Sequence, residues 1–282
     1  MDAGSLQHCL IEEESQKFER DGFFVVHDAL PPQLVGELVA AVDRLDREYR
    51  ARDGICSNEL IHILDFIGRD PSFLKLLDWP LTFPKVWGIL GWNIQLYHTD
   101  MIISPPEKNE ESRRKKRLEW HQDSGRLNLE LEGDPRPRVS LKVGFFLTDT
   151  SKPGHGNFCI VSGSHRRNEL EIPQDGVSDP EDALAVCVPP GTAVFFDRRL
   201  WHSGSPNHSD LARKVLFYGY SYRWLRPRDD MTVEHLFDQC DPIQRQLLGD
   251  SSGGMGYTSP EDRDVPLKLW LKEQLGRSAL AP

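Results

Sequence analysis

The residues best suited to chemistry in this chain are two histidines and an aspartate. His121 and Asp123 are separated by one residue in a Trp-His-Gln-Asp motif, and His202 follows later in Leu-Trp-His-Ser-Gly. On an extended strand, residues two apart point to the same face, so His121 and Asp123 can hold one cation together. A third ligand from His202 would complete a facial set of two imidazoles and a carboxylate. Such a set leaves positions open for substrates and is typical of non-haem Fe(II) oxygenases.

A basic residue further along the chain favours a specific form of this chemistry. Arg213 opens a run of β-forming residues a short distance after His202. An oxygenase that uses a 2-oxo acid must neutralise the far carboxylate of that acid in a shielded pocket, and a guanidinium does so with two parallel hydrogen bonds. A lone His-x-Asp pair is weak support, because a solvent-exposed histidine and a capping aspartate give the same letters by accident. The pair, the distal histidine and the arginine, in this order, are jointly more specific.

These residues fall in a part of the chain that predicts many short strands. Turns of Gly, Pro, Asn and Asp separate the β-forming runs, as in a sandwich or a double-sheet jelly roll. A strand carrying His121 and Asp123 is expected among them. The other predicted strands cover residues 94–103, 139–147, 157–161, 183–188, 192–196 and 214–224.

The chain on either side of this β region is predicted to be more helical. Apolar residues at helical spacing predict a helix from Pro32 onward and a second helical region over about 59–90, after a short helix at 12–21 and a strand at 23–26. No internal repeat or interdomain linker is visible. We therefore expect a single domain over 1–282. Its parts are a helical N-terminal part (about 12–91), a jelly-roll core (about 94–224) and a C-terminal extension (225–282), with a loop at 251–254 and a last helix at 266–275.

Composition excludes several classes of function. The 282 residues include 34 basic and 44 acidic side chains, and the net charge of −10 argues against broad binding to nucleic acid or to anionic membranes. The five cysteines are scattered without zinc-like spacing, which favours reduced thiols. The N-terminus lacks the pattern of a signal peptide, and no apolar run approaches the roughly 18 residues of a membrane span. We expect a soluble, cytoplasmic protein whose oligomeric state the sequence leaves open.

The sequence resembles the phytanoyl-CoA dioxygenase (PhyH) family of Fe(II)/2-oxoglutarate-dependent oxygenases. The resemblance runs from about Phe18 to Trp224, and its best stretches are 97–106, 120–123, 156–165 and 201–213. It implies a mainly β fold with flanking helices, namely a double-stranded β-helix (jelly-roll, cupin-like) core with N-terminal helices. It also implies that His121, Asp123 and His202 hold the iron, and that Arg213 binds the distal carboxylate of 2-oxoglutarate.

The same resemblance suggests further contacts and one distinction between reactions. Phe145 would pack against the oxo acid, and Ser203 or Ser205 would stand in for a hydroxyl that the family often has two residues after the distal histidine, where this chain has Gly204. Lys142 could contact the oxo acid or point to solvent, and His98 could contact substrate or cofactor. Related halogenases have a small residue in place of the carboxylate, so Asp123 favours hydroxylation. Asp100 departs from an apolar residue of the family, and its carboxylate would repel 2-oxoglutarate unless it meets a cation.

The expected function is hydroxylation of a small molecule by an Fe(II)- and 2-oxoglutarate-dependent dioxygenase. O2 would be the co-substrate, succinate and CO2 the co-products, and ascorbate a candidate reductant. An anionic or acyl-CoA-type substrate is one hypothesis, because the basic run Arg113 to Arg117 precedes the metal motif. The tail around Met255 to Tyr257 could close over the site. The alternatives are a non-redox cupin-type metalloenzyme (an isomerase or lyase) and a non-catalytic ligand-binding member of the family.

Overall fold

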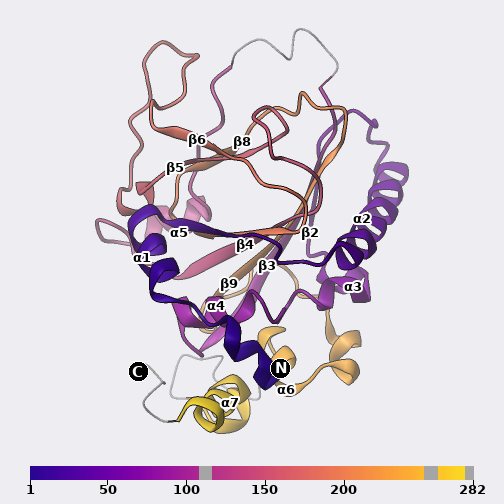
Figure 1. Cartoon of the computed structure of the whole chain (residues 1–282), viewed down its shortest axis with the longest axis vertical. Coiled ribbons are helices and arrows are strands. Elements are labelled where there is room, and N and C mark those ends of the chain that lie inside the picture. The colour runs from indigo at the N-terminus through magenta and orange to yellow at the C-terminus, as the bar shows by residue number, and fades with distance from the viewer. Residues whose placement is uncertain (108–115, 251–259, 277–282) are drawn as a thin grey trace.

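The computed structural model describes residues 1–107, 116–250 and 260–276, and two antiparallel β-sheets form its centre (Figure 1). The large sheet has the strand order β1-β7-β4-β9-β3-β2, and the small sheet has the order β6-β5-β8. The strands are β1 (Phe23–Val26), β2 (Ile61–Leu64), β3 (Ile94–Ser104), β4 (Ser140–Phe146), β5 (Phe158–Val161), β6 (Ala183–Val186), β7 (Thr192–Asp197), β8 (His202–Gly204) and β9 (Arg213–Tyr222). Each predicted β-forming run listed above overlaps one of them.

The two sheets face each other, and helices cover the other face of the large sheet. Along β9, Leu216 and Tyr218 belong to the larger apolar core, whereas Val215 and Phe217 belong to a smaller core that includes Phe158 of the small sheet. Successive residues of a strand point to opposite faces, so this alternation separates a core between the sheets from a core under the helices. In Figure 1 the small sheet lies on one side of the large sheet, and α4, α6 and α7 lie on the other.

Helices flank the sheets at both ends of the chain. α2 begins with a proline, whose missing N–H is harmless in a first helical turn, and it buries Leu34, Leu38 and Val42. It ends before Gly54, whose φ of 67° is left-handed and favours glycine. The helices are α1 (Glu12–Asp21), α2 (Pro32–Asp53), α3 (Pro71–Leu74), α4 (Phe83–Leu90), α5 (Gly125–Glu130), α6 (Pro242–Leu247) and α7 (Pro266–Leu275). Short 3-10 helices are η1 (Ala3–His8), η2 (Ile67–Arg69), η3 (Ser164–Arg166), η4 (Glu234–Gln239) and η6 (Asp262–Asp264).

The predicted helical region over 59–90 is wrong in its first part. Residues Ile61–Leu64 form β2, which pairs with β3 and alternates between buried and exposed side chains. The four residues Ile-His-Ile-Leu are too few to separate a period of two from the helical spacing of the apolar residues that follow. From η2 onward the region is helical, and α4 ends at Gly91 as predicted.

The C-terminal extension shares a core with the N-terminal helices. Leu247 of α6 and Leu271 of α7 belong to the same apolar cluster as Leu38 of α2. This common cluster supports the prediction of a single domain. The predicted last helix at 266–275 matches α7, whereas the predicted loop at 251–254 and the tail at 255–257 lie outside the described residues. Within the described ranges, none of the helices combines the length and apolarity that a membrane crossing requires.

Candidate metal centre

His121, Asp123 and His202 are brought together by backbone pairing between two segments. The N–H of His121 donates to the carbonyl of His202 at 3.0 Å, and the N–H of His202 donates back at 2.9 Å. The N–H of Asp123 donates to the carbonyl of Arg198 at 2.9 Å. The expected strand through His121 and Asp123 is wrong in form, because the pairing is an isolated bridge and the chain turns into α5 at Ser124, which has a φ of 61°.

The three side chains offer donor atoms that fit a metal ion. One ligand atom from each lies within 4.8 Å of the other two. The Nδ1 atoms of His121 and His202 lie 3.0 and 2.8 Å from the carbonyl oxygens of Glu119 and Leu200. An Nδ1–H donated to a carbonyl leaves Nε2 with a free lone pair, which is the usual tautomer of a metal-binding histidine. Asp123 Oδ2 is buried and has no hydrogen-bond partner among the described residues.

The charge states of these groups also suit metal binding. Burial lowers the pKa of His202 to about 4, so its imidazole is neutral at physiological pH. Burial alone would raise the pKa of Asp123, but the ammonium of Lys142 outweighs this and holds the pKa well below its usual range. Neutral imidazole and ionised carboxylate are the forms that bind a metal without first losing a proton.

Lys142 is buried at the centre rather than exposed to solvent. It lies on β4, and its Nζ is 2.8 Å from Asp123 Oδ1. Burial disfavours the charged amine, yet the nearby carboxylate of Asp123 raises the pKa of Lys142 on balance. The ammonium therefore bonds Oδ1 of Asp123, the same oxygen that lies 3.9 Å from His202 Nε2, while Oδ2 has no partner among the described residues.

A cavity of about 310 Å³ adjoins the three candidate ligands. Ser203 and Arg213 line it together with Lys142, and Phe158, Ile102, Phe196 and Phe217 supply apolar walls. Arg213 is 5% exposed, and its Nε has no hydrogen-bond partner among the described residues. Burial lowers its pKa to about 10, so the guanidinium stays charged at neutral pH. A buried cation of this kind, facing a cavity, is suited to bind an anion.

Two of the predicted contact residues are not brought to the cavity. Phe145 lies on the opposite face of β4, in the core under the helices, with its ring centroid 5.6 Å from that of Tyr218. A strand alternates, so Lys142 and Phe146 are on the cavity side and Phe145 cannot be. His98 is buried outside the lining residues, beside Tyr97 at a β-bulge. Burial, followed by the charge of Lys142, holds the pKa of His98 well below its usual range.

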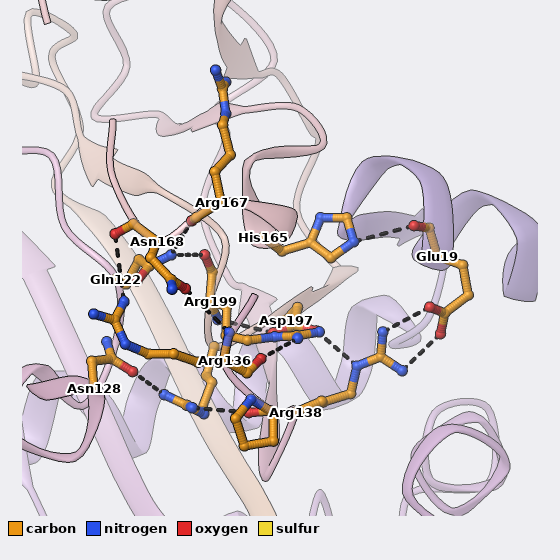
Figure 2. A network of polar contacts seen from close by, with 12 residues as sticks. Glu19, Gln122, Asn128, Arg136, Arg138, His165, Arg167, Asn168, Asp197 and Arg199 are labelled. Carbon is orange, nitrogen blue, oxygen red and sulfur yellow. Dashed lines mark hydrogen bonds and ion pairs between the residues drawn. The ribbon is translucent and has the colours of Figure 1, made fainter. Parts of the chain in front are cut away.

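A polar network fixes the segments that carry the candidate ligands (Figure 2). The side-chain amide of Gln122 donates to the carbonyls of Arg199 and Arg167, at 2.6 and 3.1 Å. Asn128 donates to the carbonyl of Asp123 at 2.9 Å and accepts from Arg198. Gln122 and Asp123 are thus tied to neighbouring stretches of chain, and Arg198 in turn bonds Asn128, which helps to position the candidate ligands.

The same network continues to α1 through a buried carboxylate. Asp197 is fully buried, and it accepts hydrogen bonds from Arg199 at 2.7–2.9 Å and from Arg138 at 2.7 Å. Arg138 also donates to both carboxylate oxygens of Glu19, as Figure 2 shows. Sequence reasoning missed these residues. Only their pairing in three dimensions distinguishes them from surface charges.

Two further cavity residues, His62 and Arg228, were absent from the predicted site, and Asp100 was expected near the oxo acid only as a departure from the family. His62 of β2, Asp100 of β3 and Arg228 of the C-terminal extension all line the cavity. Asp100 does meet a cation-forming group, because His62 contacts its carboxylate. His62 was missed because β2 was predicted to be helical. Arg228 was missed because it lies beyond the last strand, where no sequence pattern indicates a cavity residue.

The predicted basic run is only partly described. Residues 113–115 lie outside the described ranges. Arg117 donates to the carbonyls of Ser178 and Pro173 and lies 3.6 Å from Asp175, so it packs on a surface loop and not at the cavity.

Comparisons with known proteins agree with this geometry. Residues 62–215 match the profile of the family described as phytanoyl-CoA dioxygenase (PhyH). The chain is 25% identical over 247 residues to an "Ectoine dioxygenase" of Bordetella parapertussis, which covers 77% of each chain. It is 26% identical over 150 residues to a "Probable alpha-ketoglutarate-dependent hypophosphite dioxygenase" of Stutzerimonas stutzeri, which covers 47% of this chain and 46% of that one.

Solved structures show the same fold. HygX from Streptomyces hygroscopicus with iron bound superposes with a TM-score of 0.60 at 18% identity, covering 78% of this chain and 89% of that one. EctD from S. alaskensis with 2-oxoglutarate and 5-hydroxyectoine superposes with a TM-score of 0.59 at 20% identity, covering 78% of each. The predicted double-stranded β-helix core with flanking helices is confirmed.

Proposed function

The chain belongs to the phytanoyl-CoA dioxygenase family, and from that premise we propose that His121, Asp123 and His202 hold Fe(II). It is a 2-oxoglutarate-dependent dioxygenase whose cofactors are iron and 2-oxoglutarate. We assign hydroxylation of a small molecule as its reaction, with succinate and CO2 as co-products. The convergence of the three donor atoms beside a buried arginine carries this proposal.

The residues around the cavity divide the work of the reaction. Arg213 binds the distal carboxylate of 2-oxoglutarate, because its buried guanidinium faces the cavity with an unused donor. Ser203 adds a hydroxyl on the same wall, and Lys142 fixes the orientation of the Asp123 carboxylate beside His202. Iron, when bound, supplies the oxygen activation that the protein side chains cannot supply. The apolar walls exclude water and hold the substrate C–H bond near the metal.

The two alternatives make different demands on these residues. A cupin-type isomerase or lyase has no need for Arg213, because its reaction uses no oxo acid. A non-catalytic ligand-binding protein has no need for three metal donors that lie within 4.8 Å of one another. The dioxygenase assignment uses both features.

Anaerobic reconstitution with Fe(II) and 2-oxoglutarate tests the assignment without a known substrate. We expect the weak visible charge-transfer band of an iron-bound oxo acid in the wild type. Arg213→Ala should weaken the band and lower the affinity for 2-oxoglutarate. Arg126→Ala, which removes an exposed arginine of α5, is the matched control and should leave the band unchanged. Full iron occupancy without a band would favour the cupin-type alternative.

The relatives supply the first substrates to screen. Ectoine and hypophosphite, which appear in the names of two of them, are both small. A cavity of about 310 Å³ lies at the lower end of the range for ligand sites, and it must hold the oxo acid as well. We therefore assign a small substrate. Stimulation of succinate release by either compound would identify the substrate type.

A further inference from the structure

Asp100 is a cavity carboxylate that has few partners within the protein. It lies on β3 opposite Phe217 of β9, and its side chain is 6% exposed yet lines the cavity. Among the described residues Asp100 forms an ion pair with His62, and its Oδ1 accepts no hydrogen bond. Burial of an ionised carboxylate is unfavourable unless the group is paired and hydrogen-bonded. The described residues therefore leave Asp100 incompletely paired.

Two other buried aspartates of the same chain have several partners. Asp197 accepts from two guanidinium groups and a backbone N–H. Asp229 accepts from the backbone N–H groups of Thr99 and Asp65, at 2.5 and 3.2 Å. The fold can therefore provide partners for a buried carboxylate. Where a native structure leaves one with so few, a functional role is the usual reason.

His62 is a weak permanent counter-ion for Asp100. It lies on the edge strand β2, its side chain is 49% exposed, and it lines the same cavity. An exposed side chain such as that of His62 changes rotamer readily. A ligand that enters the cavity can therefore take the place of this contact.

The co-substrate does not explain Asp100. 2-Oxoglutarate carries two carboxylates, which the Asp100 carboxylate would repel, whereas Arg213 and Lys142 attract them. The charges in the cavity thus direct the oxo acid toward Arg213 and Lys142. Arg228, the third cation of the lining, already donates to Asp229 and to the carbonyl of Thr99. The surroundings of Asp100 are left to the substrate.

We propose that Asp100, with His62 beside it, recognises the substrate through a cationic nitrogen such as an ammonium, amidinium or guanidinium group. This inference rests on the proposed function, since it assigns the remaining part of the cavity to the molecule that is oxidised. The nitrogen donates a hydrogen bond to Asp100 and completes its pairing. A site with a buried acceptor discriminates strongly against analogues that lack the donor, so Asp100 determines specificity.

An isosteric pair of probes tests this assignment. Acetamidinium and acetamide have nearly the same shape, and only the first is charged. Calorimetry on the protein loaded anaerobically with Fe(II) and 2-oxoglutarate should show at least tenfold tighter binding of acetamidinium. In Asp100→Asn this preference should fall to about one. Asp182→Asn, which makes the same change in an exposed surface ion pair, should keep the wild-type preference.

Two results would overturn the proposal. One is equal binding of the two probes by the wild type, and the other is a preference for acetamidinium that survives in folded Asp100→Asn protein. Thermal unfolding monitors the fold of each variant in parallel. The charge-transfer band of the same samples reports separately on the proposed function. If the band is absent while the preference for acetamidinium depends on Asp100, the dioxygenase assignment fails and the cation site stands.

Discussion

The wall that carries the candidate metal ligands and the wall formed by β2 and β3 differ in how completely their charges are paired. On the first wall, Asp197 is bound by Arg138 and Arg199, and Gln122 fills two carbonyl acceptors (Figure 2). On the second wall, the ion pair of Asp100 within the described residues is with His62. A fully paired network is rigid and holds ligands in place, whereas an under-paired group is costly until something binds to it. We infer from this difference that the first wall positions the candidate metal ligands and that the second wall recognises the substrate.

The largest effect should come from the first wall at the metal itself. His202→Ala removes one of three candidate ligands, and two ligands hold Fe(II) poorly. We expect the iron affinity to fall by about a hundredfold or more, because loss of even an outer contact to a metal ligand costs roughly 10–100-fold. Equilibrium dialysis against Fe(II) under anaerobic conditions measures it. An unchanged affinity for Fe(II) in His202→Ala would show that the metal does not bind between His121, Asp123 and His202.

The second effect concerns the stability of the paired wall. Asp197→Asn leaves Arg138 and Arg199 without their buried counter-charge, and breaking a buried pair in this way costs about 3–5 kcal/mol in the free energy of unfolding. Denaturant titration gives the value. A loss below about 1 kcal/mol would mean that this network does not hold the wall together.

A subtler change separates positioning from stability. Gln122→Ala removes a buried amide that bonds two carbonyls, and we expect a loss of about 1–3 kcal/mol in the free energy of unfolding. Because Gln122 stands between two candidate ligands, iron affinity should fall about tenfold while 2-oxoglutarate affinity of the iron-loaded protein changes little. Equal losses of both affinities would point to a general loosening of the cavity instead.

The sequence predicted those site residues that are identified by their type and by their spacing along the chain. The His121–Asp123 pair, the later His202 and the Arg213 that opens β9 can be read from residue types in order. The structure brings all four to one cavity. The alternation of side chains around Lys142 could also be predicted from the sequence. Which face of the strand points to the cavity could not be predicted. Because Lys142 points to the cavity, Phe145 points to the opposite core. A period of two divides the residues of a strand between two faces, but it does not tell which face is toward the cavity until the packing of the sheet is known.

The second wall was harder to predict for a different reason. His62 lies in a four-residue strand that was predicted to be helical because of the spacing of the apolar residues around it. It contacts Asp100 only because β2 pairs with β3. Likewise, Arg198 bonds Asn128 and Asp197 bonds Arg138 across long sequence separations. Contacts of this kind depend on tertiary packing, which no local pattern encodes.

An Asp→Asn substitution on the wall formed by β2 and β3 should change the free energy of unfolding in the opposite direction from Asp197→Asn. Asp100→Asn removes a buried charge that has few partners, so we expect the free energy of unfolding to rise by about 1 kcal/mol, in contrast to the loss in Asp197→Asn. Denaturant titration of the two variants side by side makes the comparison direct. A loss as large as that of Asp197→Asn would make Asp100 and His62 a structural pair and would remove the distinction between the walls.

The smallest effect should come from the outer end of the paired network. Glu19 is 61% exposed, so its ion pair with Arg138 is screened by solvent and should contribute only about 0.2–1 kcal/mol. The hydrogen bond from Arg138 lowers the pKa of Glu19 below its ordinary value of 4.5. A carboxyl whose pKa is lower in the folded state stabilises the fold above its ordinary pKa, and it loses this contribution as the pH falls through the folded value. Glu19→Gln should therefore be slightly less stable than the wild type at pH 7 and equal to it in strong acid. A difference in stability that is independent of pH would assign the effect to packing of the side chain rather than to its charge.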